Sequence, residues 1–253
     1  TVLGNDDKNN NFVIKQLNKK INKKIFCQND FSTITKTRFI NSSNVKLFQA
    51  TNEEEIFLNT KIEKKIISFL KRKIKSYDIV IINDFGHGLL TTKLRNFMQK
   101  QSKYLAVSTQ TNSSNTGYHY ITKYFNADYI SIDEPEARLA LQDKFGPSDK
   151  LFSKLIKKIK FKIGSITFGA HGTKVYSNNR IHFAPALADK PVDTLGAGDA
   201  YFSISSLCSK TMKDEKVIGF LGNIAGALEI RNMGHRKYLN KLEVLNYVKS
   251  FLH

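Results

Sequence analysis

Val192-Asp193-Thr194-Leu195-Gly196-Ala197-Gly198-Asp199-Ala200 is a loop of small residues that runs directly into apolar residues at helical spacing. Gly196, Ala197 and Gly198 carry no bulky side chain, so a ligand can approach the backbone closely. Free N–H groups and the positive end of the helix dipole make such a helix start an anion site. Asp199 would lie beside that anion, where a carboxylate can take a proton from an attacking hydroxyl.

The same segment also fits a tight turn between a strand and a helix, with Asp199 as a favourable charge at the helix start. Two other phosphate-binding loops are excluded. The chain has no G-K-[S/T] sequence, which a Walker A loop needs. Tyr201 occupies the third glycine position of the dinucleotide-binding fingerprint. From the residues alone, the segment is either a phosphoryl-transfer site or a structural turn.

Short apolar runs alternate with helical patterns on both sides of this segment. The run 78–82 is continuous, as in a strand buried on both faces of a parallel sheet. The alternation predicts one α/β domain over 1–253, a doubly wound, mostly parallel sheet flanked by helices. The expected strands are 32–40, 45–50, 78–82, 104–107, 128–132, 163–168, 173–176 and 181–184. The expected helices are 12–21, 53–75, 91–101, 134–141, 151–159, 198–208, 215–230 and 243–252.

The composition narrows the class of protein. The 253 residues, of which 41% are hydrophobic, suffice for one large domain with a buried core. No apolar run of some 18 residues predicts a transmembrane helix, and the start of the chain has no signal-peptide pattern. Cys27 and Cys208 are far apart in sequence, which indicates two free thiols rather than a zinc site or a disulfide framework. We therefore expect a cytoplasmic protein.

The net charge of +18 favours anionic ligands. Of the 40 basic residues, however, 33 are Lys and seven are Arg, and the lysines are spread along the chain. Nucleic-acid recognition also relies on Arg, and no helix-turn-helix, zinc-finger or RNP-like sequence is present. We expect neither a nucleic-acid nor a membrane partner, while an anionic small-molecule substrate would benefit from this field.

The string Asp193-Thr194-Leu195-Gly196-Ala197-Gly198-Asp199 closely resembles the D-T-x-G-A-G-D signature of the ribokinase (PfkB) family of carbohydrate kinases. The resemblance implies a ribokinase-like fold with remnants of a small β lid. It also implies phosphoryl transfer from ATP to a sugar, with Mg²⁺. The amides of Gly196, Ala197 and Gly198 would then stabilise the γ-phosphoryl group, with Asp199 as the base and Thr194 supporting the turn.

Three further segments resemble the nucleotide and metal elements of the family. Ile132-Asp133-Glu134-Pro135-Glu136 stands where the family carries N-x-x-E, which implies that Glu136 binds Mg²⁺ through water. Asp133 replaces the Asn of that motif, and a plain helix N-cap explains it as well. Thr167, Gly169 and Gly172 match the family's T-x-G-x-x-G turn. Asn223 lies in a segment that resembles the family's helix beside the adenine of ATP. An ordinary hairpin bend and a small-residue packing face are the alternatives there.

Two segments resemble the heptose-7-phosphate kinases of ADP-heptose synthesis in particular. Lys36 and Arg38 match a K-x-R strand, and Asn83 to Thr91 matches S-D-Y-x-K-G-x-L-T, which includes Asp84 and Gly86. Substrate contacts are implied for Lys36, Arg38, Asp84 and Gly86. Lys36 and Arg38 would either bind a substrate phosphate or face solvent on an exposed strand. The alternative for Asp84 to Gly88 is a plain turn at the end of a strand. Asn83, Phe85 and His87 depart from the pattern, and His87 replaces its lysine.

The family's first strand and its glycine-rich sugar-binding segment do not occur in this sequence. We therefore expect an N-terminally truncated kinase domain. Its implied partners are a sugar or sugar phosphate, a second copy of the chain, and a cytidylyltransferase-like domain that is fused or separate. A kinase for another sugar and a non-catalytic sugar- or nucleotide-binding module are the alternatives. The polar segment 108–112 follows an expected strand, and the sequence assigns it no role.

Overall fold

The computed structural model describes residues 1–5, 7–42, 46–52, 57–112, 115–188, 191–233 and 238–251. These residues form two compact units. The first consists of Thr1–Arg72 and His87–Leu94, and the second of Lys73–Gly86 and Arg95–His253. One kinase domain over 1–253, lacking its N-terminal segment, stays a prediction.

The first unit contains two small two-stranded sheets. Strands β1 and β2 pair in parallel, and β3 and β4 pair antiparallel with Phe39 opposite Phe48. The rings of that pair stack at 4.3 Å between centroids. The β3–β4 pair is the small β element expected from the sequence. The elements are β1 (Val2–Leu3), α1 (Asp7–Gln16), β2 (Phe26–Cys27), β3 (Thr35–Ile40), β4 (Lys46–Asn52) and α2 (Thr60–Lys73).

Helix α1 lies five residues earlier than the expected helix 12–21, since it begins at Asp7 and ends at Gln16. The side chain of Asn18 accepts the N–H of Lys20 at 2.9 Å, a turn that competes with further helix. The ammonium group of Lys23 donates to the carbonyl of Leu17 at 2.9 Å. Local side-chain bonds therefore stop the helix although its apolar spacing continues.

The second unit contains a six-stranded sheet in the order β10-β9-β8-β7-β6-β5. Strands β5 to β8 are parallel, and β9 and β10 are antiparallel to their neighbours. The expected mostly parallel sheet flanked by helices is confirmed. The strands are β5 (Val80–Asp84), β6 (Leu105–Thr109), β7 (Asn126–Asp133), β8 (Lys160–Thr167), β9 (Thr173–Ser177) and β10 (Arg180–Ala184). The helices are α3 (Thr92–Gln101), whose first turn belongs to the first unit, α4 (Glu134–Leu141), α5 (Leu151–Leu155), α6 (Ala197–Thr211), α7 (Glu215–Glu229) and α8 (Lys241–Lys249).

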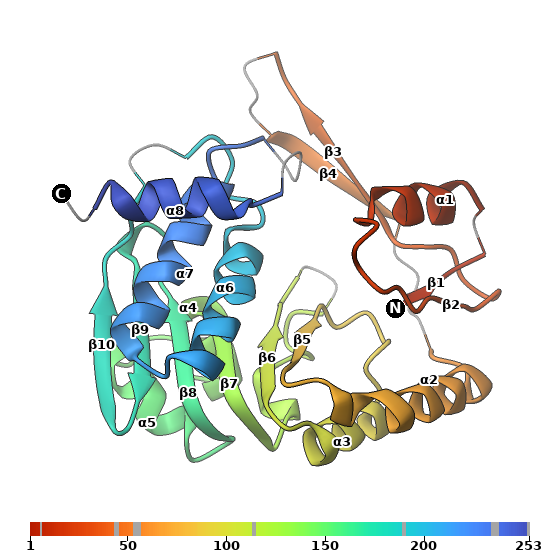
Figure 1. Cartoon of the computed structure of the whole chain (residues 1–253), viewed down its shortest axis with the longest axis horizontal. Coiled ribbons are helices and arrows are strands. Elements are labelled where there is room, and N and C mark those ends of the chain that lie inside the picture. The colour runs from red at the N-terminus through yellow and green to blue at the C-terminus, as the bar shows by residue number, and fades with distance from the viewer. Residues whose placement is uncertain are drawn as a thin grey trace. The chain divides into compact units, whose positions relative to one another are not determined.

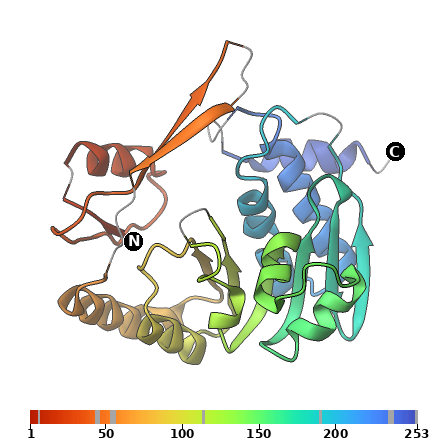
Figure 2. The same ribbon diagram turned by 180° about the vertical axis from the view of Figure 1, so that it is seen from behind.

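Helices cover both faces of this sheet. Figure 1 shows α6 and α7 in front of it, and the reverse view in Figure 2 shows α4 and α5 on the other face. The core between the sheet and α6 and α7 includes Tyr129, Val175, Phe202 and Ile218, each buried. Within the described ranges, no helix is both long and apolar enough to cross a membrane.

Buried hydroxyl groups fix α6 on the sheet. The phenolic oxygen of Tyr129 on β7 lies 2.8 Å from both Ser165 Oγ on β8 and Ser205 Oγ on α6. Tyr201 on α6 donates to Ser165 Oγ at 3.0 Å. Hydrogen-bonded polar groups in a core determine one arrangement of the elements that carry them. The first turn of α6, which contains Asp199, is therefore held at a defined place above the sheet.

Candidate active site

The carboxyl ends of four parallel strands bring polar residues to one edge of the second unit's sheet. Strands β5, β6, β7 and β8 end at Asp84, Thr109, Asp133 and Thr167. Asp84 stands opposite Thr109, and Asp133 stands opposite Thr167. Ligands of open parallel sheets bind at this edge. The structure thus places three of the predicted site residues, Asp84, Asp133 and Thr167, at the edge where a ligand is expected.

The start of α6 has the backbone geometry of an anion site. Gly196 caps the helix with φ 79° and ψ −3°, a left-handed conformation that favours glycine. The first i→i−4 bond is donated by Ala200 to the carbonyl of Gly196 at 2.8 Å, so Gly198 and Asp199 lie in the first turn. A Cβ atom at Gly198 would meet no described atom within 4 Å. A phosphate group can approach the backbone there.

Two amide side chains hold the carboxylate of Asp199. Asn83 Nδ2 donates to Asp199 Oδ1 at 2.7 Å, and Gln110 Nε2 donates to the same oxygen at 2.6 Å. Asn83 is the fourth residue of β5, and Gln110 follows β6 directly. The sequence motifs identify Asn83 only as a departure from the family pattern and assign Gln110 no role. The one sequence feature that points to Gln110 is its place in the polar segment 108–112, which follows an expected strand.

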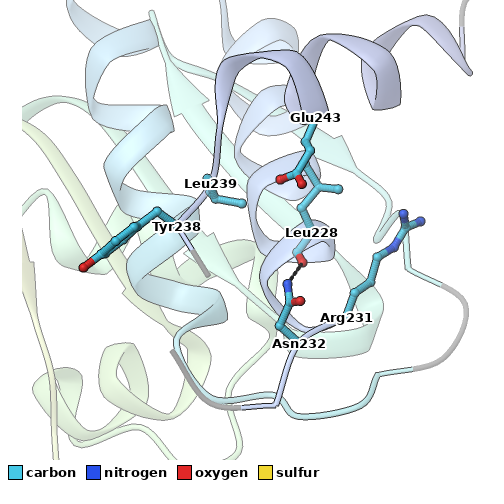
Figure 3. A pocket seen from close by; sticks show the side chains of 6 residues that line it. All are labelled: Leu228, Arg231, Asn232, Tyr238, Leu239 and Glu243. Carbon is cyan, nitrogen blue, oxygen red and sulfur yellow. Dashed lines mark hydrogen bonds between the residues drawn. The ribbon is translucent and has the colours of Figure 1, made fainter. Parts of the chain in front are cut away.

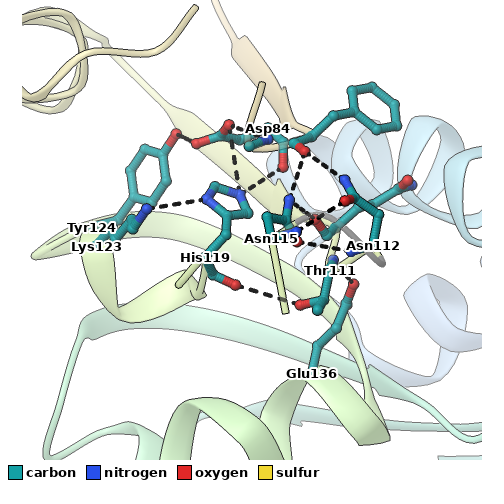
Figure 4. Close-up of polar contacts among 11 residues, drawn as sticks. Asp84, Thr111, Asn112, Asn115, His119, Lys123, Tyr124 and Glu136 are labelled. Carbon is teal, nitrogen blue, oxygen red and sulfur yellow. Dashed lines mark hydrogen bonds and ion pairs between the residues drawn. The ribbon is translucent and has the colours of Figure 1, made fainter. Parts of the chain in front are cut away.

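Glu136 and Asp133 form a reciprocal cap at the start of α4. Glu136 N donates to Asp133 Oδ1 at 2.7 Å, and Asp133 N donates to Glu136 Oε2 at 2.9 Å. The remaining oxygen of Glu136 accepts the N–H of Thr111 at 2.8 Å, as Figure 4 shows. Burial, followed by the charge of Asp133, raises the pKa of Glu136 to about 7, and the charge of Asp199 adds to the rise. Glu136 is therefore close enough to Asp199 for the two carboxylates to interact.

Asp84 is buried and already has partners. Tyr124 donates to Asp84 Oδ2 at 2.8 Å (Figure 4). The N–H of Gly86 donates to Asp84 Oδ1 at 3.1 Å. Gly86 has φ 74°, and a Cβ there would come within 2.3 Å of Asn115 Nδ2. In this structure both residues shape the turn after β5, whereas the sequence implied substrate contacts for them.

His119 is buried beside Asp84. Its Nε2 lies 3.0 Å from the carbonyl oxygen of Asp84, and its Nδ1 lies 3.4 Å from Lys123 Nζ (Figure 4). A neutral imidazole fits both contacts, since Nε2–H donates to the carbonyl and Nδ1 accepts from the ammonium group. Burial lowers the pKa of His119, although the Asp84 carboxylate opposes that shift and Lys123 and Arg95 add to it.

We expect the stabilising contribution of His119 to fall as the pH drops below about 6.5, the pKa of histidine in an unfolded chain, while the raised pKa of Glu136 acts in the opposite direction over the same range. The pKa of His119 is lower in the folded state, so its contribution is complete above that pH. At lower pH the unfolded chain binds the extra proton, which costs up to about 1.4 kcal/mol per pH unit. Urea unfolding of the wild type and of His119→Gln from pH 7.5 to 5.5 isolates this contribution, because the stability of the wild type relative to the variant should fall with the pH. An equal pH-dependent difference between the wild type and the exposed-site control His171→Gln would contradict the assignment.

The predicted nucleotide turn lies between β8 and β9. Phe168 N donates to the carbonyl of Gly172 at 2.8 Å, and Gly172 N donates to the carbonyl of Gly169 at 3.1 Å. Asn223 on α7 accepts from Thr173 Oγ1 at 2.7 Å, and its Nδ2 donates to the carbonyls of Ala184 and Pro185 at 3.0 and 2.7 Å. Its side chain therefore joins α7 to the β9–β10 hairpin behind the turn.

A small cavity of about 210 Å³ lies at the end of α7 (Figure 3). A Cβ at Gly226, near the end of α7, would lie 3.5 Å from the carbonyl of Ala197, so this part of α7 is next to the start of α6. The cavity therefore begins two residues after Gly226, which lies at the contact between α7 and α6. Its lining residues are Leu228, Arg231, Asn232, Tyr238, Leu239 and Glu243.

Three further predicted residues are Lys36, Arg38 and Thr194. Lys36 and Arg38 project from one face of β3 in the first unit, opposite Thr51 and Gln49. Thr194 is exposed in the loop before α6, and its carbonyl accepts the N–H of Ala197 at 3.4 Å.

The sequence of the chain matches the model of the pfkB family carbohydrate kinases over residues 6–239. The chain belongs to this family. It is therefore a carbohydrate kinase by family. The match includes the start of α6 and every predicted site residue.

Curated relatives of this pfkB family kinase include two proteins named Bifunctional protein HldE. The one from Helicobacter hepaticus is 26% identical over 234 residues, which covers 89% of this chain and 46% of the relative. The one from Aliarcobacter butzleri is 26% identical over 245 residues, which covers 92% and 49%. The kinase described here thus spans about half the length of these relatives.

Solved structures similar to this pfkB family kinase agree with its fold. Phosphofructokinase-2 from Escherichia coli, in complex with potassium, superimposes with a TM-score of 0.80 at 14% identity, covering 100% of this chain and 81% of that one. Ribokinase from Thermotoga maritima gives a TM-score of 0.71 at 16% identity, covering 98% and 80%. The ribokinase-like fold expected from the sequence is confirmed.

Proposed function

We propose that this kinase transfers the γ-phosphoryl group of ATP to D-glycero-D-manno-heptose 7-phosphate, with the 1-hydroxyl as the acceptor. The observation that carries the proposal is Asp199 in the first turn of α6, beside the open backbone at Gly198. The choice of sugar is supported by the relatives named HldE and by the two sequence segments that resemble heptose-7-phosphate kinases. Their bifunctional name also supports a cytidylyltransferase-like partner domain, fused or separate.

The proposed reaction needs a base and an anion site side by side. Asp199 accepts the proton of the attacking hydroxyl, while the amides at the start of α6 stabilise the charge on the phosphoryl group during its transfer. Both amide donors bind Oδ1 of Asp199, and no hydrogen bond from the described residues reaches Oδ2, so Oδ2 is available for this step. The cavity at the end of α7 is the proposed place for the nucleotide base.

Glu136 fits the role of a Mg²⁺ ligand that acts through water. Its carboxylate has a raised pKa and interacts with the charge of Asp199, and a nearby cation would relieve both effects. Mg²⁺ keeps several waters and takes few protein ligands, which suits a single carboxylate next to substrate phosphates. When bound, Mg²⁺ would neutralise developing charge on those phosphates.

We expect Glu136→Gln to raise the Mg²⁺ concentration needed for half-maximal activity by about 10-fold or more, a typical loss for an outer-shell partner. The measurement is the rate of ADP release against free Mg²⁺. Glu134→Gln is the matched control, because Glu134 is on the same helix and pairs with Arg138 at 2.7 Å. The role of Glu136 would be wrong if both variants shifted the Mg²⁺ requirement equally.

The choice of acceptor is tested by initial rates on a panel of sugars and sugar phosphates. We expect the highest kcat/KM with heptose 7-phosphate and a new phosphate at the 1-position of the product, detected by ³¹P NMR. Fructose 6-phosphate, ribose and heptose without phosphate are the comparisons. A clearly higher kcat/KM for one of these would contradict the heptose proposal and leave the carbohydrate kinase assignment in place.

A further inference from the structure

The two amides that bind Asp199 come from adjacent parallel strands. Asn83 lies on β5 and stands opposite Ser108 on β6, and Gln110 follows β6 by one residue. Their donor atoms approach the same oxygen, Asp199 Oδ1, at 2.7 and 2.6 Å. These distances are short for N–H···O bonds, as expected when the acceptor is charged. Among the described residues, no hydrogen bond reaches Asp199 Oδ2.

Gln110 is itself fixed by the backbone around it. Its N–H donates to the carbonyl of Asp84 at 2.9 Å, which ties it to the end of β5. Its carbonyl accepts from Asn115 Nδ2 at 3.4 Å, and the same Nδ2 donates to the carbonyl of Phe85 at 2.9 Å. Figure 4 shows Asn115 close to Asp84 and Asn112. The loop that carries Gln110 is therefore fastened to the strand that carries Asn83.

Asn83 has an unsatisfied carbonyl. Its Oδ1 is buried and has no hydrogen-bond partner within the described part of the chain, while its Nδ2 binds Asp199. A buried acceptor without a donor is costly and rare in folded proteins. A flipped amide would set its carbonyl oxygen against the Asp199 carboxylate, so the orientation is fixed. Among the described residues, the hydrogen bond to Asp199 is the contact of this side chain that offsets the cost.

We propose that Asn83 and Gln110 are positioning residues for Asp199. They hold Oδ1 and thereby turn Oδ2 toward the place of the acceptor hydroxyl. Both donors are neutral, so they orient the carboxylate without the positive charge that would strongly disfavour proton uptake. The inference rests on the proposed function, because it assigns the base of that reaction its geometry. Positioning to within a fraction of an ångström is what such supports supply.

The test compares Gln110→Ala, Asn83→Ala and Gln110→Glu, assayed with the sugar that the wild-type protein phosphorylates fastest. We expect each alanine variant to lower kcat by about 10²-fold with KM for ATP nearly unchanged. Gln110→Glu should lower kcat further, since an acceptor of equal size faces the carboxylate. Gln99→Ala is the matched control: Gln99 is buried, binds the backbone N–H of Phe125 at 2.7 Å, and should keep kcat while losing thermal stability.

The decisive arm combines Gln110→Ala with Asp199→Asn. Because Gln110 acts through Asp199, the double variant should turn over no more slowly than Asp199→Asn alone. Additive losses, or an unchanged kcat in Gln110→Ala and Asn83→Ala, would overturn the positioning role while the kinase assignment stands. A wild-type protein without sugar-dependent ADP release would instead overturn the proposed function, and this inference with it.

Discussion

Replacing Asp199 by Asn lowers the rate of phosphoryl transfer by about 10³-fold or more, within the range that a positioned general base contributes. Asparagine keeps the size of the side chain but cannot accept the proton of the acceptor hydroxyl. The backbone of the anion site does not depend on the side chain, since Gly196 caps the helix. The variant should therefore keep its melting temperature and its affinity for ATP. The measurements are single-turnover kinetics and calorimetric ATP titration.

The neighbouring Asp193 provides a control for the effect of a lost carboxylate. Its Oδ1 accepts the N–H of Leu195 at 3.0 Å, so Asp193→Asn retains an acceptor for the loop before α6. We expect this variant to keep most of the turnover. Equal losses in the two variants would show that the net charge around α6, and not proton transfer at Asp199, determines the rate.

Replacing Gly172 by Ala destabilises the protein by about 3 kcal/mol or more, the sum of a strained backbone and an overpacked contact. Gly172 has φ 95°, and a Cβ there would lie 2.2 Å from the carbonyl oxygen of Ala184 and 2.7 Å from Ala186 N. Backbone atoms can move away from an added Cβ less easily than the ends of flexible side chains can. Asn223 also holds this backbone through the carbonyls of Ala184 and Pro185.

Gly169, in the same turn, is the matched control. It has φ 55°, but a Cβ there would meet no described atom within 4 Å. Gly169→Ala should cost about 1 kcal/mol, the strain of a left-handed residue alone. Urea unfolding monitored by circular dichroism measures both variants. Equal costs would mean that the contact with the Ala184 backbone does not limit residue 172.

Helix α4 shows what local sequence determines. The predicted range 134–141 is the observed one, because Asp133 and Glu136 cap each other and Pro135 is in the first turn. The start of α6 was predictable for the same reason, since its small residues and Asp199 are adjacent in sequence. Thr91, the first residue of the predicted helix 91–101, caps α3, with its Oγ1 accepting the N–H of Leu94 at 3.2 Å.

The hydrogen bonds to the Asp199 carboxylate depend on tertiary structure instead. Asn83 and Gln110 are 116 and 89 residues away in sequence and meet Asp199 through the order of β5 and β6 and the packing of α6. The burial of Asp84 has the same origin, because Tyr124 is 40 residues further along the chain. Motif spacing predicted which residues gather at the strand ends, but not which of them bind one another.

The release of ADP from ATP and Mg²⁺ on addition of a sugar tests the central claim most directly. The wild-type chain should release ADP only when an acceptor sugar or sugar phosphate is present, in a one-to-one ratio with phosphorylated sugar, and Asp199→Asn should release almost none. ADP release that does not depend on any acceptor, or equal release by the wild type and Asp199→Asn, would contradict phosphoryl transfer to a sugar with Asp199 as the base.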